Sequence, residues 1–419
     1  MKLKNTLTLV LAGMMVASMS ACGAQSSIVI DENGEKKTVQ SVSNRTQAVA
    51  GNSVAVNEGA EENGPITLKN VTTAKNVILM IGDGMGPQQI KAGELYKEET
   101  LTMQNFPYMT TVETRSASDV ITDSAAAGTA LATGRRTTNG MVGKDPNYLN
   151  LETIVDIASG MGKSTGIIAT EELYGATPMT FAAHAYNRND KACLLETAAT
   201  TSNVNLFASY VMEESYQNIF TNAGYTKIDS VEDISDSTSG KVFGSYKIKA
   251  TAPSMSADAS KVALDRLVTE ALEYLSKDED GFFLMAEGSH IDHGGHNNDM
   301  TYMLQELLAF DDAVQAVLEW AKDRDDTVVI VTADHETGGL ELKESAYTAL
   351  DFLDTESFDG GMTYVPMHYA WTTTSHSAAD VNLYINGADI DFRNYSFGVD
   401  SRIKNTDVFK IMKGLLLGE

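Results

Sequence analysis

The chain has 419 residues, of which 43% are hydrophobic and 21% are charged, so it can bury a large core in one domain or in two smaller ones. Its formal net charge of −26 argues against nucleic acid as a partner, because that interface needs clustered lysine and arginine side chains to neutralise phosphates. Solubility alone explains such acidity, and so does a set of carboxylates held against bound divalent cations.

The first residues indicate an export signal. Lys2 and Lys4 supply positive charge, and the apolar stretch Leu7–Met19 that follows is too short to span a bilayer. The sequence therefore predicts a signal peptide over residues 1–21 and an exported chain, located in the cell envelope or outside the cell.

A lipid anchor is predicted at Cys22. The segment Met19–Gly23 resembles the lipobox of bacterial lipoproteins, in which the cysteine becomes the lipid-modified first residue of the mature chain. Met19 stands where leucine is more usual, and the alternative is an ordinary secretory signal with an incidental cysteine. With its lipid attached, the chain is expected to be held at a membrane.

The composition changes near residue 66. Residues 22–65 are rich in serine, asparagine, glycine and glutamate with no sustained period, which predicts a flexible tether. Over residues 66–419, strand-like apolar runs alternate with helical patterns. This predicts an α/β domain, a three-layer sandwich with a largely parallel central sheet flanked by helices. Residues 229–256 and 343–367 are predicted to be surface insertions, the second overhanging the site.

The apolar patterns predict individual elements in this domain. Strands are expected at Asn76–Ile81, Ser164–Ala169, Gly281–Ala286, Thr327–Thr332 and Val381–Ile385. Helices are expected where apolar residues recur at helical spacing, at Leu151–Ala158, Lys261–Leu275, Met300–Ala321 and Thr406–Leu417. Because α/β sheets place their sites in the loops at the carboxyl ends of strands, the residues that follow these strands are candidates for function.

Three of the expected strands end abruptly in residues that bind metals. The glycine-rich segment Gly82–Gly86 turns around Asp83, although such a turn is equally typical of a plain strand-to-helix loop. The segment Glu287–His296 holds one glutamate, one aspartate and three histidines, a mixture that suits zinc. The segment Ala333–Gly339 follows the next strand with an aspartate, a histidine and a glutamate. Two such endings together favour a metal site over chance.

A serine stands at the start of another expected helix. Ser124 precedes the segment Ala125–Ala132, which is a strong helix former. Local sequence alone favours a role for Ser124 as the helix N-cap. The alternative is a nucleophile, because the field at a helix N-terminus favours a serine alkoxide and an incoming phosphate.

Taken together, these segments resemble the alkaline phosphatase family, from Asn76 to the final helix. The motifs occur in the family's order at Gly82–Gly86, Thr122–Ala126, Ala176–Pro178, Glu287–His296, Ala333–Gly339 and Thr374–His376. The resemblance implies hydrolysis of phosphate monoesters to alcohol and inorganic phosphate through a phosphoserine on Ser124. It implies small-molecule monoesters as substrates and leaves the oligomeric state open, a homodimer included.

The same resemblance implies two zinc ions and a third metal ion, usually magnesium. The ligands implied for the first zinc, which would activate the hydrolytic water, are Asp292, His296 and His376. Those implied for the second zinc, which would place the Ser124 oxygen for attack, are Asp83, Asp334 and His335. Four carboxylates in one site would repel one another strongly unless cations lay between them.

The third metal site departs from the family pattern. Asp83, Thr177 and Glu287 are its implied ligands, but family members usually have aspartate or histidine where this chain has Gly175. We expect water, or a nearby acid such as Glu172, to complete the shell. Magnesium is therefore expected to be held weakly or replaced by another ion.

Further residues are expected around the metals and the phosphate. Arg188 matches the family's phosphate-clamping arginine, whose planar donors bind two oxygens at once, although without the match it would be taken for a surface arginine near a helix end. His293 and Asp123 are expected just behind the ligands.

Two other functions remain open at this stage. The first is a phosphodiesterase, phosphonate hydrolase or sulfatase of the same superfamily, against which stand the serine nucleophile and the monoesterase positions of Thr177, Glu287 and Arg188. The second is a noncatalytic lipoprotein that captures phosphate or metal, which would require a broken catalytic set. The set is intact apart from Gly175.

Overall fold

The computed structural model describes residues 73–248, 262–343, 368–387 and 402–418, and the backbone of strand residues 25–30, 36–41, 351–352 and 366–367. The chain divides into two compact units, Met1–Ser53 and Val54–Glu419. In the first unit β1 (Gln25–Ile30) pairs antiparallel with β2 (Lys36–Ser41), within the segment predicted as a tether. The predicted signal peptide and Cys22 lie outside the described residues, so both stay predictions.

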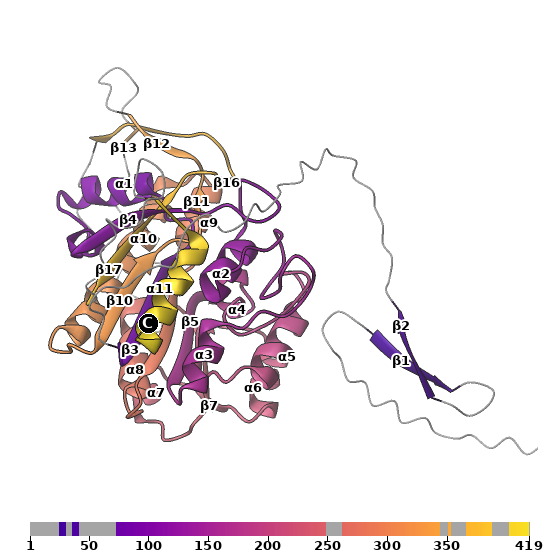
Figure 1. The fold of residues 1–419 in the computed structure, drawn as a ribbon. Coiled ribbons are helices and arrows are strands. Elements are labelled where there is room, and N and C mark those ends of the chain that lie inside the picture. Colours follow the sequence, from indigo (N-terminus) through magenta and orange to yellow (C-terminus); the bar gives the residue numbers. More distant parts are fainter. Residues whose placement is uncertain are drawn as a thin grey trace, which may run out of the picture. The chain divides into compact units, whose positions relative to one another are not determined.

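The second unit is built on a ten-stranded sheet in the order β18-β4-β17-β10-β3-β9-β5-β6-β8-β7 (Figure 1). In that order the strands are Ile403–Lys404, Tyr108–Glu113, Val381–Asn386, Thr327–Thr332, Asn76–Gly82, Phe282–Gly288, Ser164–Glu172, Leu206–Tyr210, Val242–Tyr246 and Thr226–Ile228. All neighbouring pairs are parallel except those of β17, which runs antiparallel to both β10 and β4. The predicted α/β class with a largely parallel central sheet is therefore confirmed.

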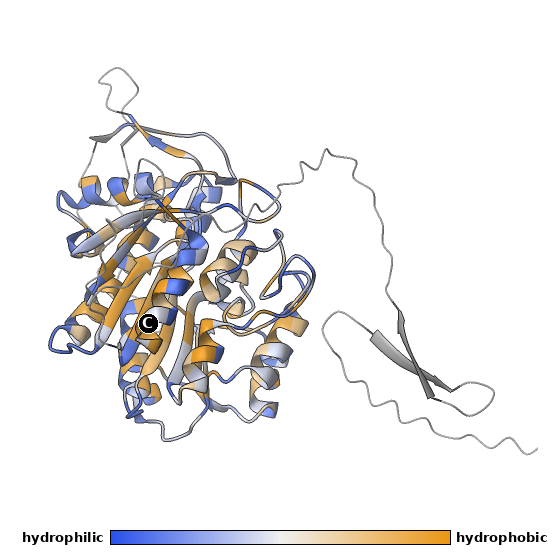
Figure 2. Ribbon diagram, viewed as in Figure 1, coloured by the Kyte–Doolittle hydropathy of each residue, from blue (hydrophilic) through white to orange (hydrophobic). Residues whose placement is uncertain are grey.

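The central strands are continuous apolar runs because helices cover both of their faces. Every residue of β3, β9 and β10 is buried. In register, Val77 of β3 lies between Phe283 of β9 and Val328 of β10, so apolar residues of three neighbouring strands lie side by side in the middle of the sheet. Figure 2 shows these strands as the most hydrophobic part of the domain.

Helices form the outer two layers. On one face α11 (Asn405–Leu417) packs against α2 (Ser124–Thr133) and α3 (Ile154–Gly160), and Figure 1 shows α11 across the front of the sheet. On the other face α10 (Met300–Ala321) packs against α8 (Leu264–Leu275) and the strands beneath it. The remaining helices are α1 (Pro87–Lys97), η1 (Thr102–Asn105), α4 (Ala176–Met179), α5 (Lys191–Thr201), α6 (Glu214–Asn222), α7 (Asp233–Asp236) and α9 (His290–His296). Among the helices that the structure describes, none has both the length and the apolar character needed to cross a bilayer.

The predicted insertions need one correction. Residues 242–246, within the predicted insertion 229–256, are the strand β8, which lies between β6 and β7 and is largely buried. Its serine- and lysine-rich flanks concealed a short apolar strand. Much of the second predicted insertion lies outside the described residues, and in the described part β13 (Asp351–Phe352) pairs with β14 (Pro366–Met367).

Short strand pairs shape the chain that follows β10. The strand β11 (Glu336–Thr337) pairs with β16 (His376–Ser377), and β12 (Leu340–Leu342) pairs with β15 (Tyr369–Trp371). These antiparallel pairs bring the distant His376 next to the loop at the end of β10.

Candidate metal centre

Candidate ligands gather at the carboxyl ends of four adjacent strands. The strands β10, β3, β9 and β5 are neighbours in the sheet and run parallel. Asp83 directly follows β3, Glu287 is the penultimate residue of β9, and Asp334 lies two residues beyond β10. Since parallel strands present their carboxyl ends at one edge, residues more than 250 positions apart meet there.

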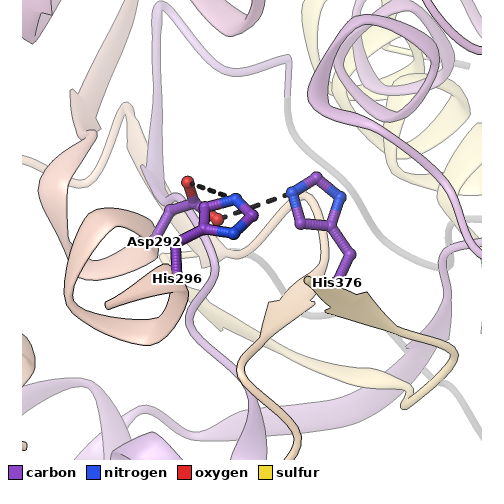
Figure 3. Close-up of side chains that lie close together, drawn as sticks. All are labelled: Asp292, His296 and His376. Atoms are coloured by element: carbon purple, nitrogen blue, oxygen red, sulfur yellow. Dashed lines mark ion pairs between the residues drawn. The ribbon is translucent and has the colours of Figure 1, made fainter. Parts of the chain in front are cut away.

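The first cluster joins Asp292, His296 and His376. Its ligand atoms lie within 4.8 Å of one another, and Figure 3 shows both imidazoles beside the Asp292 carboxylate. The Nε2 atoms of His296 and His376 lie 3.3 Å and 3.6 Å from the oxygens of Asp292. Each Nδ1 contacts a carbonyl oxygen, that of Thr374 at 2.7 Å and that of Thr122 at 2.9 Å. A carbonyl only accepts, so each Nδ1 carries the proton and each neutral ring keeps Nε2 as an electron-pair donor.

The second cluster, Asp83, Asp334 and His335, is more deeply buried. Its ligand atoms also lie within 4.8 Å of one another. His335 Nε2 is 3.5 Å from Asp83 Oδ1 and 3.2 Å from Asp334 Oδ2. The backbone N–H groups of Gly84 and His335 donate to Asp334 Oδ1 and fix that carboxylate. Burial, followed by the proximity of the His376 ring, lowers the pKa of His335 well below its ordinary value, so the ring is the neutral form that metals bind.

The glycine after Asp83 allows the two clusters to approach. Gly84 has φ +73°, and a Cβ there would lie 2.6 Å from the Asp292 Cα atom. Both the left-handed backbone and the close contact require glycine. The predicted glycine-rich turn is thus a structural condition for bringing Asp292 against the second cluster.

Thr337 connects the two clusters and was not identified from the sequence. Its hydroxyl donates to Asp292 Oδ1 and lies 3.2 Å from His335 Nδ1. A carboxylate only accepts, so the Thr337 hydrogen goes to Asp292 and its oxygen accepts from the His335 Nδ1–H group. The sequence carries no signal for this role beyond the position of Thr337 two residues after His335.

Ser124 is not the N-cap of its helix. The cap of α2 is Asp123, whose Oδ1 accepts from the Ala126 N–H at 3.0 Å, so the interpretation favoured by local sequence is wrong. Ser124 is the first residue of α2 and is 4% exposed. Its Oγ lies 3.1 Å from His335 Nε2, which puts the hydroxyl directly against the second cluster.

Asp123 holds Arg188 beside Ser124. Its Nη1 donates to Asp123 Oδ2 at 3.2 Å, and the Gly140 N–H donates to the same oxygen at 3.0 Å. One carboxylate thereby caps α2 and holds the guanidinium next to Ser124. Asp123 therefore lies directly behind Ser124, and the role expected for it there stays a prediction.

A third group of oxygens surrounds Glu287. Its side chain is completely buried, and within the described part of the chain neither carboxylate oxygen accepts a hydrogen bond, nor does Asp83 Oδ1. Thr177 approaches the group, with its Oγ1 3.5 Å from Asp334 Oδ2. Burial and the surrounding carboxylates raise the pKa values of Asp83 and Glu287 well above their ordinary range. Orphaned oxygens in a site of this charge fit bound cations.

The space above Gly175 is filled by Glu171. A Cβ on Gly175 would lie 1.8 Å from the Glu171 Oε1 atom. The sequence suggested water or Glu172 for this shell, and that suggestion stays a prediction. Two consecutive glutamates give no indication of which one lies beside Gly175, and the structure shows that it is Glu171. Burial raises the pKa of Glu171 to about 7.

His293 lies apart from the ligand atoms of its own helix. Its ring centroid is 4.7 Å from that of His290, one turn earlier on α9, whereas Asp292 and His296 contact each other. The role expected for His293 behind the ligands stays a prediction.

The fold and these clusters are those of an α/β protein with paired carboxylate–histidine sites around a helix-terminal serine. A family model described as "Alkaline phosphatase" matches residues 74–220 and 217–369. Alkaline phosphatase 4 of Bacillus subtilis (strain 168) is 33% identical over 292 residues, 64% of this chain and 62% of that protein. Alkaline phosphatase of Escherichia coli (strain K12) is 30% identical over 334 residues, 62% of this chain and 70% of that protein.

Solved structures agree with this assignment. The alkaline phosphatase from the Antarctic bacterium TAB5 superposes with a TM-score of 0.69 at 28% identity, covering 83% of this chain and 99% of that chain. A mutant of the same enzyme is described with Mg bound in its M3 site. The chain therefore belongs to the alkaline phosphatase family. Its match spans somewhat less than two thirds of the length of the first Bacillus subtilis relatives, at 62% and 63%.

Proposed function

We propose that this protein hydrolyses small-molecule phosphate monoesters to alcohol and inorganic phosphate through a phosphoserine on Ser124. The observation that carries the proposal is the 3.1 Å contact between Ser124 Oγ and His335 Nε2, at a helix N-terminus bordered by two carboxylate–histidine clusters. The homologues named alkaline phosphatase support the same class of activity.

The donor sets suit two zinc ions and one magnesium ion. Imidazole nitrogens with carboxylates in the two clusters are typical of zinc, whereas the oxygen-only set of Asp83, Thr177 and Glu287 is typical of magnesium. When bound, such ions act as Lewis acids that stabilise charge on the attacking and leaving oxygens of an in-line displacement.

The side chains of this protein perform the remaining tasks. Ser124 Oγ attacks phosphorus as the O–P bond to the alcohol breaks, and water then hydrolyses the phosphoserine, releasing phosphate and regenerating the serine. The N-terminus of α2 favours negative charge at this oxygen and on the phosphate. Arg188 binds phosphate oxygens with the donors that its contact to Asp123 leaves available.

A substrate panel tests the proposed reaction. The purified, metal-loaded protein should hydrolyse an aryl phosphate monoester much faster than the matching diester or sulfate. A preference for the diester or the sulfate would replace the monoesterase proposal with one of the superfamily alternatives.

We also propose that the chain is exported and lipid-anchored through Cys22. The support is the charged and apolar leader ahead of a lipobox-like segment. Cells that express the protein should incorporate labelled fatty acid into it, and Cys22→Ser should abolish that labelling. Equal labelling of the variant would overturn the anchor.

A further inference from the structure

Two neighbouring strand ends bring Glu171 against the third group of oxygens. On β5 and β9, Ala169 is in register with Glu287. Beyond that pair, the Ser289 N–H donates to Thr170 Oγ1 at 2.8 Å, and the Glu171 N–H donates to Ser289 Oγ at 3.3 Å. These bonds fix the backbone of Glu171 beside the end of the strand that carries Glu287.

The Glu171 side chain is directed over Gly175, toward the helix that carries Thr177. Its Oε1 atom occupies the place where any other residue at 175 would put its side chain, since a Cβ there would lie only 1.8 Å away. No side chain fits at position 175 while the Glu171 carboxylate stays there. Gly175 has φ −51°, so this steric conflict, and not a left-handed backbone, explains the glycine.

The adjacent acid faces elsewhere. Burial and the charge of Glu172 raise the pKa of Tyr174, whose ring lies 3.9 Å from Lys191 Nζ. Glu172 therefore belongs to a surface cluster with Tyr174 and Lys191.

Glu171 also acts electrostatically on the other carboxylates of the site. After burial, Glu171 is the largest electrostatic cause of the raised pKa of Glu287, and it also contributes to that of Asp83. Glu287 and Asp83 also have buried oxygens that accept no hydrogen bond within the described part of the chain, so the pocket gathers carboxylates in a way that suits a bound cation.

We propose that Glu171 is a ligand of the third cation, magnesium, and that it completes a shell with Asp83, Thr177 and Glu287. The inference rests on the proposed function only for the existence of that cation. All four side chains offer oxygen, the donor that magnesium prefers, and water fills the remaining positions. Glu171 then supplies the carboxylate that residue 175 lacks. The site therefore keeps its full number of carboxylates, and its affinity for magnesium is not reduced by Gly175.

Direct binding measurements test this ligand. Magnesium chloride is titrated calorimetrically into zinc-loaded wild-type protein, Glu171→Gln and the matched control Glu172→Gln. We expect Glu171→Gln to weaken magnesium binding by at least about tenfold, since loss of even an outer partner of a metal costs roughly 10- to 100-fold in affinity. Glu172→Gln should bind like wild type, and zinc content should be equal in all three proteins.

A competing role for Glu171 gives a different result. Burial raises the pKa of Glu171 and the charge of Arg188 partly offsets that rise, so the competing role of the glutamate is to serve only as the countercharge of that arginine. In that case Glu171→Gln would change the inhibition constant of inorganic phosphate and leave the magnesium isotherm unchanged. That outcome would overturn the inference while leaving the monoesterase proposal, which depends on Ser124, intact.

A relocated carboxylate provides the converse test. In Glu171→Gly combined with Gly175→Asp, the space above residue 175 is vacated and the carboxylate is supplied from the other backbone position. We expect the double variant to regain much of the magnesium affinity lost in Glu171→Gln, whereas Gly175→Ala alone should lose affinity by displacing Glu171. Wild-type affinity in Gly175→Ala would contradict the steric argument.

Discussion

The two carboxylate–histidine clusters use the same kinds of ligand and differ in their burial. The side chains of Asp334 and His335 are completely inaccessible, whereas His296 in the first cluster is 38% exposed. The second cluster follows the core strands β3 and β10, and the first is assembled from α9 and the short strand β16. This difference separates a cluster that is part of the core and contacts Ser124 from a cluster at the rim of the site. Under the proposed function, water and product would exchange at the rim.

The largest difference in turnover and stability is expected between His335→Ala in the second cluster and His296→Ala in the first. His335→Ala should lower turnover by more than about 100-fold, the upper cost of losing an outer metal partner, because it removes a ligand outright. It should also lower the melting temperature more than His296→Ala does, since it leaves Asp83 and Asp334 buried without a cation. Zinc analysis and thermal melting of both variants measure the effect. Equal losses of stability would remove the distinction between core and rim.

Removing the Thr337 hydroxyl should have a smaller effect than removing a ligand, and it should weaken zinc binding at both clusters. Thr337→Val keeps the shape but removes the bonds to Asp292 and His335, so zinc affinity should fall by about 10- to 100-fold. Thr337→Ser, which keeps the hydroxyl, should retain most of it. If valine weakens only one of the two zinc sites, as shown by competition with a chelating dye, Thr337 does not couple them.

The smallest expected effect is on stability against pH. Asp83, Glu287 and Glu171 have raised pKa values in the fold, that of Glu171 reaching about 7, so the native state holds protons that the unfolded chain has released. Metal-free protein should therefore lose stability as pH rises from about 4, the ordinary range of carboxyl groups, to about 7. Metal-loaded protein should lack most of this slope, because cations take the place of the protons.

Denaturant melts at several pH values, with and without chelator, measure that slope. Glu306, whose pKa burial raises to about 8, belongs to neither cluster, so it affects both forms alike and cancels in the difference. Identical slopes for the two forms would show that the site carboxylates are not the cause.

The sequence predicted the elements that end in ligands because they combine two strong signals. β3, β9 and β10 are continuous apolar runs followed directly by Asp83, by Glu287 and the motif around Asp292, and by Asp334 with His335. Strand direction then brings these ends together without further information. The short strand β8 was not predicted, because five residues between polar flanks carry little periodic signal.

The residues that sequence missed depend on side-chain direction. Asp123 and Ser124 are both good caps, and only the turn geometry decides that Asp123 takes the role. Glu171 and Glu172 are adjacent, and β5 has an irregular register between Ile168 and Glu172, so alternation could not be assigned beforehand. Thr337 acts through two hydrogen bonds to residues of different elements, which no local pattern encodes.

The most direct test of the account is Ser124→Ala, measured for monoester turnover and zinc content together. Ser124 is nearly buried and its oxygen contacts His335, so removing one atom should leave the fold and both zinc sites in place. Turnover should fall by at least about 10⁴-fold, as when other enzymes lose their nucleophile. If Ser124→Ala keeps most of its activity and has normal zinc content, the central claim that Ser124 is the nucleophile is contradicted.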